Sequence, residues 1–451
     1  MRLIVQMLLL RDAVKKVNSV AIVGATPIEG KIGNIILRNI VDWGFNGDIF
    51  LVNPKYSSIH EYRAFPSLLD LPSIPDIVVI AIPEKDVGKV LEESAEIGAK
   101  LAVVITSNAE ISENLKEEFR ERMRIIGPNS AGITLSKYKL HASIEVPPST
   151  GKVGIVAQSG AVGGVVLSRL SLLSSGVSFF FSLGNSADIS VEDALEYAID
   201  DDNTEAVIAY IEWLKNGRKF IDVASTLRKR GKPLCVLKGG RGEASEKAAR
   251  SHTGGIATDY SLFKAAVRQA GGYLASDLDE VVEVCEVMRR IRIADEPKPI
   301  IITNSGGVGV ISVSLMDELG IKVKIPSIEI LPQKYGGKVK QGNPLDLGGD
   351  AYIDDILEVL SNNRLPEEFN LSVLIYVPTA SEKPEKISEA IKKRAKDFSL
   401  PTIGMFAGAG SVEIIESVSS VIPVVSTSAI LSKAIHALWM NRGNKDGDES
   451  S

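Results

Sequence analysis

One of the four histidines of this 451-residue chain lies in a short run of small residues, Ser251-His252-Thr253-Gly254-Gly255. An imidazole between Ser, Thr and Gly has little apolar surface to pack, so the run is typical of an exposed loop that can move. The same surroundings suit a nucleophile that must approach more than one partner. His252 is therefore a candidate nucleophile, and an ordinary solvent-exposed histidine is the alternative.

A carboxylate that could orient this imidazole stands at Glu212. The run 206–211 before it is apolar enough for a buried central strand, so Glu212 would lie at the carboxyl end of that strand. Open α/β sheets hold their ligands at those ends. Glu212 could accept the Nδ1–H of the imidazole and leave Nε2 free to take a phosphoryl group. A solvated glutamate at the start of a loop is the alternative.

The third candidate feature is a helix start at Ser159-Gly160-Ala161, directly after a strand-like run. The free N–H groups of a helix start can hold a phosphate or a carboxylate. Asn129, in Gly127-Pro128-Asn129-Ser130, could add a side-chain amide from the neighbouring domain. The pattern recurs at Ser305-Gly306, so a helix start without a ligand is the alternative.

Strands that alternate with helices must position these residues. In the first part of the chain we predict a helix over 34–43 and strands at 20–23, 49–52, 77–82, 101–105 and 125–126. This alternation predicts a parallel, doubly wound sheet. The tight turn Gly24-Ala25-Thr26 after the first strand would present backbone N–H groups to a phosphate.

The second strand ends Val52-Asn53-Pro54-Lys55, without the acidic residue that holds a ribose hydroxyl in dinucleotide enzymes. A basic residue there favours a phosphorylated ribose or a pyrophosphate, so coenzyme A fits better than NAD. An NAD-dependent dehydrogenase is thereby disfavoured, and a Rossmann-like domain without a ligand stays open.

The second and third parts of the chain resemble each other. The run 151–162 has its counterpart in 298–308, since both are a strand, then (Gln/Asn)-Ser-Gly, then a helix. Later landmarks recur in the same order: 183–185 against 342–344, 207–212 against 373–378, and 233–240 against 401–410. The repeat predicts two flavodoxin-like domains. A polar, Pro-rich stretch at 292–299 marks the boundary between them.

Composition narrows the function further. The net charge of −6 gives no general attraction to nucleic acid or to an anionic membrane, so local donors must hold any anion. The apolar segment 1–10 is too short to span a bilayer and is predicted to be a packed helix. Cys235 and Cys285 lie in apolar runs and are predicted to be buried thiols. We expect a cytoplasmic protein with a disordered tail at 441–451.

Other polar residues invite simpler interpretations. Asp188 and Asp193 match no calcium loop, and capping of the helix that follows explains them better. His60, His141 and His436 have no partners that would form a metal site and are interpreted as structural. No metal site is predicted on this chain.

From residue 19 to about residue 439 the chain resembles the α subunit of the ADP-forming acetyl-CoA synthetases, in the succinyl-CoA synthetase superfamily. The resemblance rests on motifs whose order and spacing are specific as a set: 19–25, 52–55, 126–129, 158–161, 183–185, 210–212, 215–220 and 251–254. It implies a Rossmann-like CoA-binding domain (1–148), a flavodoxin-like domain with the phosphohistidine loop (149–292) and a second flavodoxin-like domain (293–440).

The resemblance also implies an acid–thiol ligase reaction, in which acyl-CoA, phosphate and ADP give the free acid, CoA and ATP. Acyl phosphate forms first, its phosphoryl group passes to His252, and phospho-His252 then phosphorylates ADP, with Glu212 supporting the phosphohistidine. The phosphate is expected at Ser159, Gly160 and Ala161, with Asn129 beside it. CoA is expected near these residues: Gly24, Ala25, Thr26, Lys55, Ile82, Pro83, Thr106 and Ser107.

In relatives a separate ATP-grasp β subunit binds ADP and Mg²⁺, which suggests an α2β2 assembly here, and no ATP-grasp stretch is found in this sequence. The chain departs from the family pattern at Ser130, Trp213, Asn108-Ala109 and Gly255. Those departures leave the acyl group open. They also keep a non-catalytic CoA-binding or regulatory protein of the same fold as the alternative.

Overall fold

The structure of the chain is a computed structural model that describes residues 7–242, 259–326, 339, 342–361 and 368–440. The chain forms two compact units. The first unit contains Met1–Ser168 and Gly176–Leu274, and the second contains Arg169–Ser175 and Ala275–Ser451. Each unit is described by itself below.

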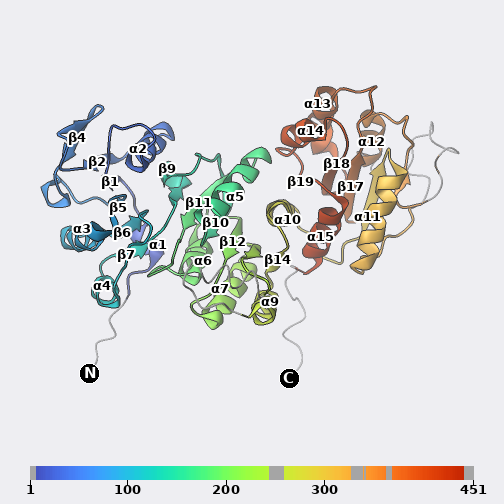
Figure 1. Cartoon of the computed structure of the whole chain (residues 1–451). Helices are drawn as coiled ribbons and strands as arrows, with labels where there is room; N and C mark the ends of the chain where they lie inside the picture. The colour runs from blue at the N-terminus through green and yellow to red at the C-terminus, as the bar shows by residue number, and fades with distance from the viewer. Residues whose placement is uncertain (1–6, 243–258, 327–338, 340–341, 362–367, 441–451) are drawn as a thin grey trace, which may run out of the picture. The chain divides into compact units, whose positions relative to one another are not determined.

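The first sheet of the first unit follows the dinucleotide-binding order (Figure 1, blue to teal). Its strands are β1 (Ser19–Val23), β2 (Asp48–Val52), β3 (Ser58–Ile59), β4 (Tyr62–Phe65), β5 (Ile77–Ile80), β6 (Leu101–Val104) and β7 (Arg124–Ile126). They lie in the order β3-β4-β2-β1-β5-β6-β7, and all neighbours are parallel except β3 and β4. From β4 to β7 this is the order 3-2-1-4-5-6, with its switch point between β1 and β5.

Helices cover both faces of this sheet, which explains why β1 is apolar at every position after Ser19. The helices of this part are α2 (Ile32–Asp42), α3 (Glu84–Ile97) and α4 (Glu113–Phe119). Val20 and Ile22 belong to the same apolar cluster as residues of α2, whereas Ala21 and Val23 pack in the cluster that contains residues of α3. A strand buried on both faces reads as a continuous apolar run.

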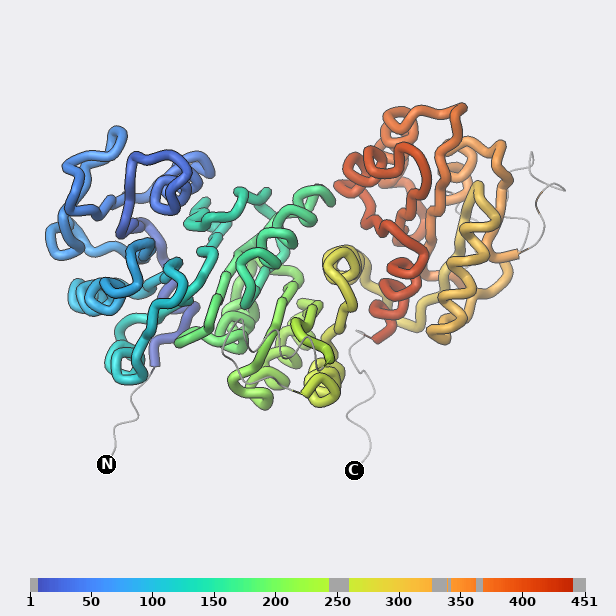
Figure 2. The backbone as a smooth tube through the Cα atoms, in the orientation of Figure 1, coloured from blue at the N-terminus to red at the C-terminus, as the bar shows by residue number. Residues whose placement is uncertain are grey.

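The second sheet of the first unit has flavodoxin-like order. Its strands are β8 (Gly132–Leu135), β9 (Leu140–Ser143), β10 (Thr150–Ala157), β11 (Val177–Ser182), β12 (Ala206–Ile211), β13 (Leu234–Lys238) and β14 (Tyr273–Ala275). They lie in the order β14-β13-β12-β10-β11-β8-β9. The antiparallel hairpin β8–β9 extends the sheet beyond β11, and Figure 2 shows the chain pass through it from the blue first sheet into the green second one. The associated helices are α5 (Gly160–Leu172), α6 (Val191–Asp200), α7 (Gly217–Lys229) and α9 (Tyr260–Gln269).

The second unit repeats the flavodoxin-like order in its own parallel sheet. Its strands are β15 (Pro299–Thr303), β16 (Leu345–Asp346), β17 (Leu371–Tyr376), β18 (Thr402–Phe406) and β19 (Val424–Val425), in the order β16-β15-β17-β18-β19. Its helices are α10 (Leu278–Arg290), α11 (Gly306–Glu318), α12 (Ile353–Leu360), α13 (Pro384–Arg394), α14 (Ser411–Val418) and α15 (Ser428–Met440). The predicted α/β fold class, a Rossmann-like domain followed by two flavodoxin-like ones, is confirmed.

Two details of the repeat differ from the prediction. Asn343 precedes β16, whereas Gly184 and Asn185 follow β11, so that pair of landmarks is not equivalent in the fold. The compact unit that holds the third sheet also includes α10, because α10 packs against α15 and β19. The domain boundaries at 148/149 and 292/293 stay predictions.

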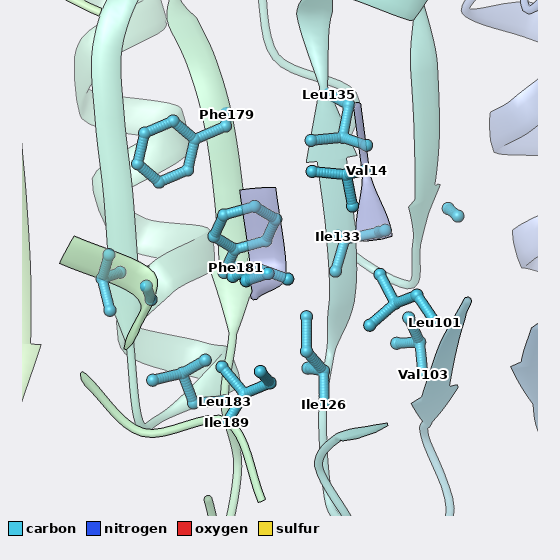
Figure 3. Packing of buried hydrophobic residues seen from close by; sticks show 14 of the residues in the cluster. Val14, Leu101, Val103, Ile126, Ile133, Leu135, Phe179, Phe181, Leu183 and Ile189 are labelled. Atoms are coloured by element: carbon cyan, nitrogen blue, oxygen red, sulfur yellow. The ribbon is translucent and has the colours of Figure 1, made fainter. Parts of the chain in front are cut away.

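One continuous apolar core joins the two sheets of the first unit. Leu101 and Val103 of β6 share a cluster with Ile133 of β8 and Phe181 of β11. Figure 3 shows Ile133 between the side chains of the first sheet and Phe181 of the second. Because the core crosses from one sheet to the other, the carboxyl ends of the two sheets hold a fixed relation within this unit.

A buried ion pair reinforces that junction. Arg124 on β7 has a side chain that is only 1% exposed, and its Nε and Nη2 donate to Asp188 Oδ2 (2.8 Å) and Oδ1 (3.0 Å). The Asp188 carboxylate also accepts the Ile125 N–H (2.8 Å). Helix capping is therefore the wrong interpretation of Asp188, because its carboxylate is the bidentate partner of a buried guanidinium.

Asp193 does cap α6, as predicted. The Ser190 hydroxyl accepts the Asp193 N–H, and the Asp193 carboxylate accepts the Ser190 N–H (3.0 Å), which makes a capping box. Burial alone would raise the pKa of Asp193, but the Lys219 ammonium at 2.7 Å and the Ser190 N–H hold it below its usual value.

The chain before β1 is not the predicted helix in its described part. Met7–Leu9 are not helical, and the four-residue helix α1 spans Leu10–Ala13. The Leu8 carbonyl accepts from Arg124 Nη1 (2.8 Å) and the Leu8 N–H donates to the Arg120 carbonyl (3.0 Å), so side-chain and loop partners replace helical ones. The predicted disordered tail, 441–451, lies outside the described residues.

Two further predictions concern burial and membrane spans. Cys235 and Cys285 are both buried and are not joined in a disulfide, as predicted. Within the described part of the chain, no helix combines the length and the apolar character needed to cross a bilayer.

The second unit contains a small apolar cavity of about 160 Å³, and one glutamate of α10, Glu283, lines it. Glu283 is 9% exposed, and its Oε2 accepts from the Ser426 N–H (2.8 Å) and hydroxyl (3.1 Å). Burial raises the pKa of Glu283 to about 7, although the Ser426 donors lower it. The other charged groups that line this cavity are Arg169, Asp279 and Glu416, of which Arg169 and Asp279 form a pair at 3.0 Å.

Glu283→Gln is expected to make stability less dependent on pH. A carboxyl whose pKa is raised in the folded state loses stability as the pH rises from its unfolded pKa near 4.5 to its folded pKa near 7. Glutamine has no such loss, so the difference in unfolding free energy between Glu283→Gln and the natural chain should grow by about 2–3 kcal/mol from pH 5 to pH 8. Urea denaturation at both pH values measures it. The exposed Glu389→Gln on α13 is the control, and an equal difference at both pH values would contradict the prediction.

Candidate active site

A cavity of about 1030 Å³ in the first unit collects most of the predicted site residues. It lies where the carboxyl ends of the first two sheets meet, at the switch point β1/β5 of the first sheet and at the end of β10 in the second. The predicted residues that line it are Gly24, Thr26, Lys55, Ile82, Pro83, Thr106, Ser107, Asn129, Ser159, Gly160 and Ala161. Ala25 is fully buried behind them, and Glu212 is not part of the lining.

The side of the cavity that the first sheet forms is called the first wall, and the side that the second sheet forms is called the second wall. In the first wall, backbone segments approach each other closely. Gly24, directly after β1, has φ +95°, and a Cβ on it would lie 2.2 Å from the Ala81 carbonyl oxygen after β5. A Cβ on Gly33 in the first turn of α2 would lie 2.1 Å from the Gly24 oxygen. Only glycine permits this packing, which brings the start of α2 to the cavity.

The charges of this wall are positive. Lys31 is the N-cap of α2 and makes no side-chain cap, and Lys31 and Lys55 both line the cavity. The first turn of a helix leaves N–H groups without helical partners, and its dipole favours an anion. Two ammonium groups beside a helix start suit a ligand that carries several phosphates.

The wall from the second sheet is the start of α5. Ser159 follows β10, its hydroxyl accepts the Val162 N–H (3.4 Å), and Gly160 begins the helix. Gly160 packs against Ala131, since a Cβ there would lie 2.7 Å from the Ala131 Cβ. The first turn of α5 therefore faces the same cavity as the first turn of α2, and it offers a second place for an anion.

Asn129 lies at the seam between the two walls. Its N–H donates to the Thr106 carbonyl (3.0 Å), and its φ of +60° turns the chain towards the second sheet. The next loop meets it there, because the Asn185 N–H donates to the Pro128 carbonyl (2.9 Å). Asn129 lines the cavity, and its side-chain amide donates to Asn185 Oδ1 (3.5 Å). Its role as a phosphate ligand stays a prediction.

Glu212 stands at the carboxyl end of β12, as predicted, and its local geometry is fixed by Gln158. Gln158 Oε1 accepts the N–H groups of Glu212 (2.7 Å) and Trp213 (3.1 Å), and Gln158 is 4% exposed. Glu212 is 8% exposed, and its Oε2 has no hydrogen-bond partner among the described residues. A buried carboxylate oxygen without a donor is unfavourable, so a donor from elsewhere would stabilise it.

The start of the segment after β13 lies against this carboxylate. The buried Lys238 ammonium donates to the carbonyls of Glu212 (2.7 Å) and Gly239. A Cβ on Gly239 would lie 2.4 Å from the Tyr210 hydroxyl and 3.1 Å from Glu212 Cγ. Burial, and after it the Glu212 carboxylate, raise the pKa of Tyr210. His252 lies outside the described residues, so its place relative to Glu212 stays a prediction.

One further histidine, His141, and one departure from the family pattern, Ser130, have structural partners. The His141 ring bonds Thr134 Oγ1 (2.8 Å) and the Glu145 carbonyl (2.9 Å), and burial lowers its pKa. The Ser130 hydroxyl donates to the Ser182 carbonyl (2.5 Å), so it ties the two sheets together. No cluster of three or more possible metal ligands occurs among the residues that the structure describes.

Several lining residues were not predicted from the sequence. Two of them could have been recognised from the sequence. Lys31 is a basic residue just before the first helix, and Asn53 is an amide just after the second strand. Glu145 and Ile144 carried no such signal, since only the tertiary packing of the β9 loop on α5 brings them to the cavity.

Comparison with known sequence families matches two of the sheets to named domains. Residues 18–136 match a family described as a CoA binding domain, and residues 150–288 match a succinyl-CoA ligase-like flavodoxin domain. The first range covers the strands of the first sheet and β8, and the second covers β10 to β14 of the second sheet.

Curated relatives match over most of the chain. It is 32% identical to the α subunit of acetate–CoA ligase (ADP-forming) I of Pyrococcus furiosus, over 95% of this chain and 97% of the relative. It is 40% identical to the acetate–CoA ligase (ADP-forming) of Methanocaldococcus jannaschii, over 74% of this chain and 48% of that protein. The chain therefore spans about half the length of this second relative.

A solved structure has the same architecture. The "dinucleotide forming" acetyl-coenzyme A synthetase 1 of Candidatus Korarchaeum cryptofilum, in complex with phosphate and ADP, superposes with a TM-score of 0.85. The match covers 96% of each chain at 29% identity.

Gln158→Leu should destabilise the first unit, because leucine cannot accept the two N–H groups that Gln158 Oε1 holds. Each buried N–H left without an acceptor costs about 1–3 kcal/mol, so for the two N–H groups a loss of about 2–6 kcal/mol in unfolding free energy is expected in chemical denaturation. Asn304→Leu is the comparison variant in the second unit, where Asn304 accepts the Val377 N–H (2.9 Å) and donates to the Val377 carbonyl (2.9 Å) after the equivalent strand β17. If the unfolding free energy of Gln158→Leu falls by less than about 0.5 kcal/mol, the two hydrogen bonds to Gln158 Oε1 do not hold the end of β12 in place.

Proposed function

Because this chain belongs to the family of ADP-forming acetate–CoA ligases, we propose that it is the α-type subunit that converts acyl-CoA and phosphate to acyl phosphate and then carries the phosphoryl group on His252. With ADP the overall products are the free acid, CoA and ATP. The observation that carries the proposal is the single cavity in which two helix starts, two lysines and Asn129 converge. This set suits a polyphosphate at one wall and a smaller anion at the other.

The first wall fits CoA by its chemistry. Lys31, Lys55 and the first turn of α2 would hold the phosphates of CoA, close to Gly24 and Thr26. Ile82, Pro83, Thr106 and Ser107 line the same wall, where the less charged part of the molecule would lie. A volume of about 1030 Å³ lies at the upper end of the range of small-molecule sites, which suits a long ligand and a second anion.

The second wall would hold inorganic phosphate at Ser159, Gly160 and Ala161. A phosphate oxygen attacks the thioester carbonyl, the C–S bond breaks, and the CoA thiolate leaves and takes up a proton. The N–H groups of the α5 start and the Asn129 amide would offset the charge on the phosphate and orient it. The products of this step are acyl phosphate and CoA.

The phosphoryl group would then pass to His252. An imidazole nitrogen attacks phosphorus, the bond from phosphorus to the acyl oxygen breaks, and the carboxylate leaves. Glu212 would accept the hydrogen bond of the other ring N–H, which keeps Nε2 unprotonated for attack and stabilises the cationic ring afterwards. The unpartnered Oε2 of the buried Glu212 supports this role.

The last step requires a nucleotide, for which we propose a partner. An ATP-grasp β subunit would bring ADP and Mg²⁺, and an oxygen of ADP would take the phosphoryl group from His252 to give ATP. We propose an α2β2 assembly in the cytoplasm. The relative from Pyrococcus furiosus carries the name "subunit alpha", which supports a separate partner.

Phosphorylation of His252 tests this proposal. After incubation of the purified chain with acetyl-CoA and phosphate, intact mass should show one acid-labile phosphoryl group, and His252→Ala should show none. Glu212→Gln should slow labelling by about 10²–10⁴-fold, because the ring loses its orienting acceptor. His60→Ala is the control, since His60 is exposed and does not line the cavity. Tight CoA binding without any labelling, with acetyl-CoA or longer acyl-CoAs, would favour a binding-only protein instead.

A further inference from the structure

One residue of the cavity has no place in the chemistry described above. Glu145 follows β9, and both its backbone N–H and its backbone carbonyl form hydrogen bonds. Its N–H donates to the Ser143 hydroxyl (3.1 Å), and its carbonyl accepts from Asn39 Nδ2 (3.0 Å) and bonds the His141 ring (2.9 Å). These bonds fix where the side chain starts, and none of them uses its carboxylate.

The carboxylate lies against α5. A Cβ placed on Gly164 would lie 2.0 Å from Glu145 Oε2, so the carboxylate occupies the space that a side chain at this position would take. Gly164 is one helical turn past Gly160, about 6 Å along the axis. Glu145 therefore stands about one turn behind the place proposed for the phosphate.

No described residue neutralises this carboxylate. Among the residues that line the cavity, Glu145 is the one acidic side chain, and the structure gives its carboxylate no hydrogen bond or ion pair within the described ranges. Burial, with no opposing cation, raises the pKa of Glu145 above its usual value. Glu145 is only partly buried, so its carboxylate is not sealed in the core and can meet a ligand in the cavity.

The layout of charge indicates which part of the ligand it meets. Lys31 and Lys55 on the first wall attract the phosphates of CoA, so the thioester end must point to the second wall, where Ser159 and Gly160 lie. The acyl group then extends from the thioester into the space beside α5. Glu145 is the charged residue of that wall.

We propose that Glu145 is a specificity-determining residue that discriminates between acyl groups by the chemical group at their distal end. It excludes acyl groups that end in a carboxylate by like-charge repulsion and accepts a hydrogen bond from those that end in a hydroxyl. This inference rests on the proposed function, because it assumes that acyl-CoA occupies the cavity. The preferred substrate class is thus neutral acyl-CoA, with hydroxyacyl-CoA favoured over the alkyl compound of equal length.

Three acyl-CoA thioesters of equal chain length test this inference: butyryl-CoA, 4-hydroxybutyryl-CoA and succinyl-CoA, which end in methyl, hydroxyl and carboxylate. The rate measured is phosphate-dependent release of CoA by the full chain. In Glu145→Gln the ratio of kcat/KM for succinyl-CoA to that for butyryl-CoA should rise by about tenfold or more, because the repulsion is gone. In Glu145→Leu the preference for 4-hydroxybutyryl-CoA over butyryl-CoA should disappear, because leucine accepts no hydrogen bond.

The controls separate specificity from general damage. Glu117→Gln on α4 is exposed and outside the cavity, and it should leave all three ratios unchanged. If kcat/KM in Glu145→Gln falls by the same factor for every acyl-CoA, the carboxylate contacts the pantetheine part that all three thioesters share. That result would overturn the inference. Unchanged ratios would overturn it too. If the natural chain releases no CoA from any thioester, it is the proposed function that fails.

Discussion

The geometry of the cavity depends on the buried pair of Arg124 and Asp188. The guanidinium sits at the start of β7 in the first sheet, and the carboxylate belongs to the loop after β11 in the second. Removal of Asp188 would leave the buried Arg124 guanidinium with only the longer contact to Asp193 (3.5 Å) and the Leu8 carbonyl, and the loss of a buried charge partner costs up to about 3–5 kcal/mol. Beside the pair, the N–H groups of Asn185 and Ala187 donate to the carbonyls of Pro128 and Gly127. The seam that carries Asn129 is therefore held by charge, by backbone hydrogen bonds and by a shared apolar core.

Local donors give this acidic chain an anion-binding cavity. The net charge of −6 repels anions at long range, yet the cavity places two helix starts and two lysines where the carboxyl ends of two sheets meet. Each helix start follows a strand at a switch point, so the same topological rule provides both anion sites. Glu145 is the exception to this positive lining, and its unpaired carboxylate distinguishes the acyl end from the phosphate end in our account.

The sequence predicted those features that local patterns determine. Apolar runs located β1, β10 and β12, and small residues after them located the turns at Gly24 and Ser159, so eleven of the predicted site residues could be placed at the cavity. Pairings across the fold were not predictable, because no local pattern records them. Asp188 was interpreted as a helix cap although it binds Arg124, and the segment before β1 was expected to be helical although the backbone of Leu8 is bonded to Arg120 and Arg124. Glu145 was missed for the same reason, since its environment depends on Gly164, nineteen residues away.

The central claim is that this cavity makes acyl phosphate from acyl-CoA and inorganic phosphate, and isotope exchange tests it most directly. The chain is incubated with acetyl-CoA, phosphate and labelled CoA, and the label in acetyl-CoA is followed over time. Our account predicts exchange that requires phosphate, because labelled CoA can enter acetyl-CoA only by the reversal of acyl phosphate formation. Exchange of equal rate without phosphate, or no exchange in a chain that binds CoA, would contradict it.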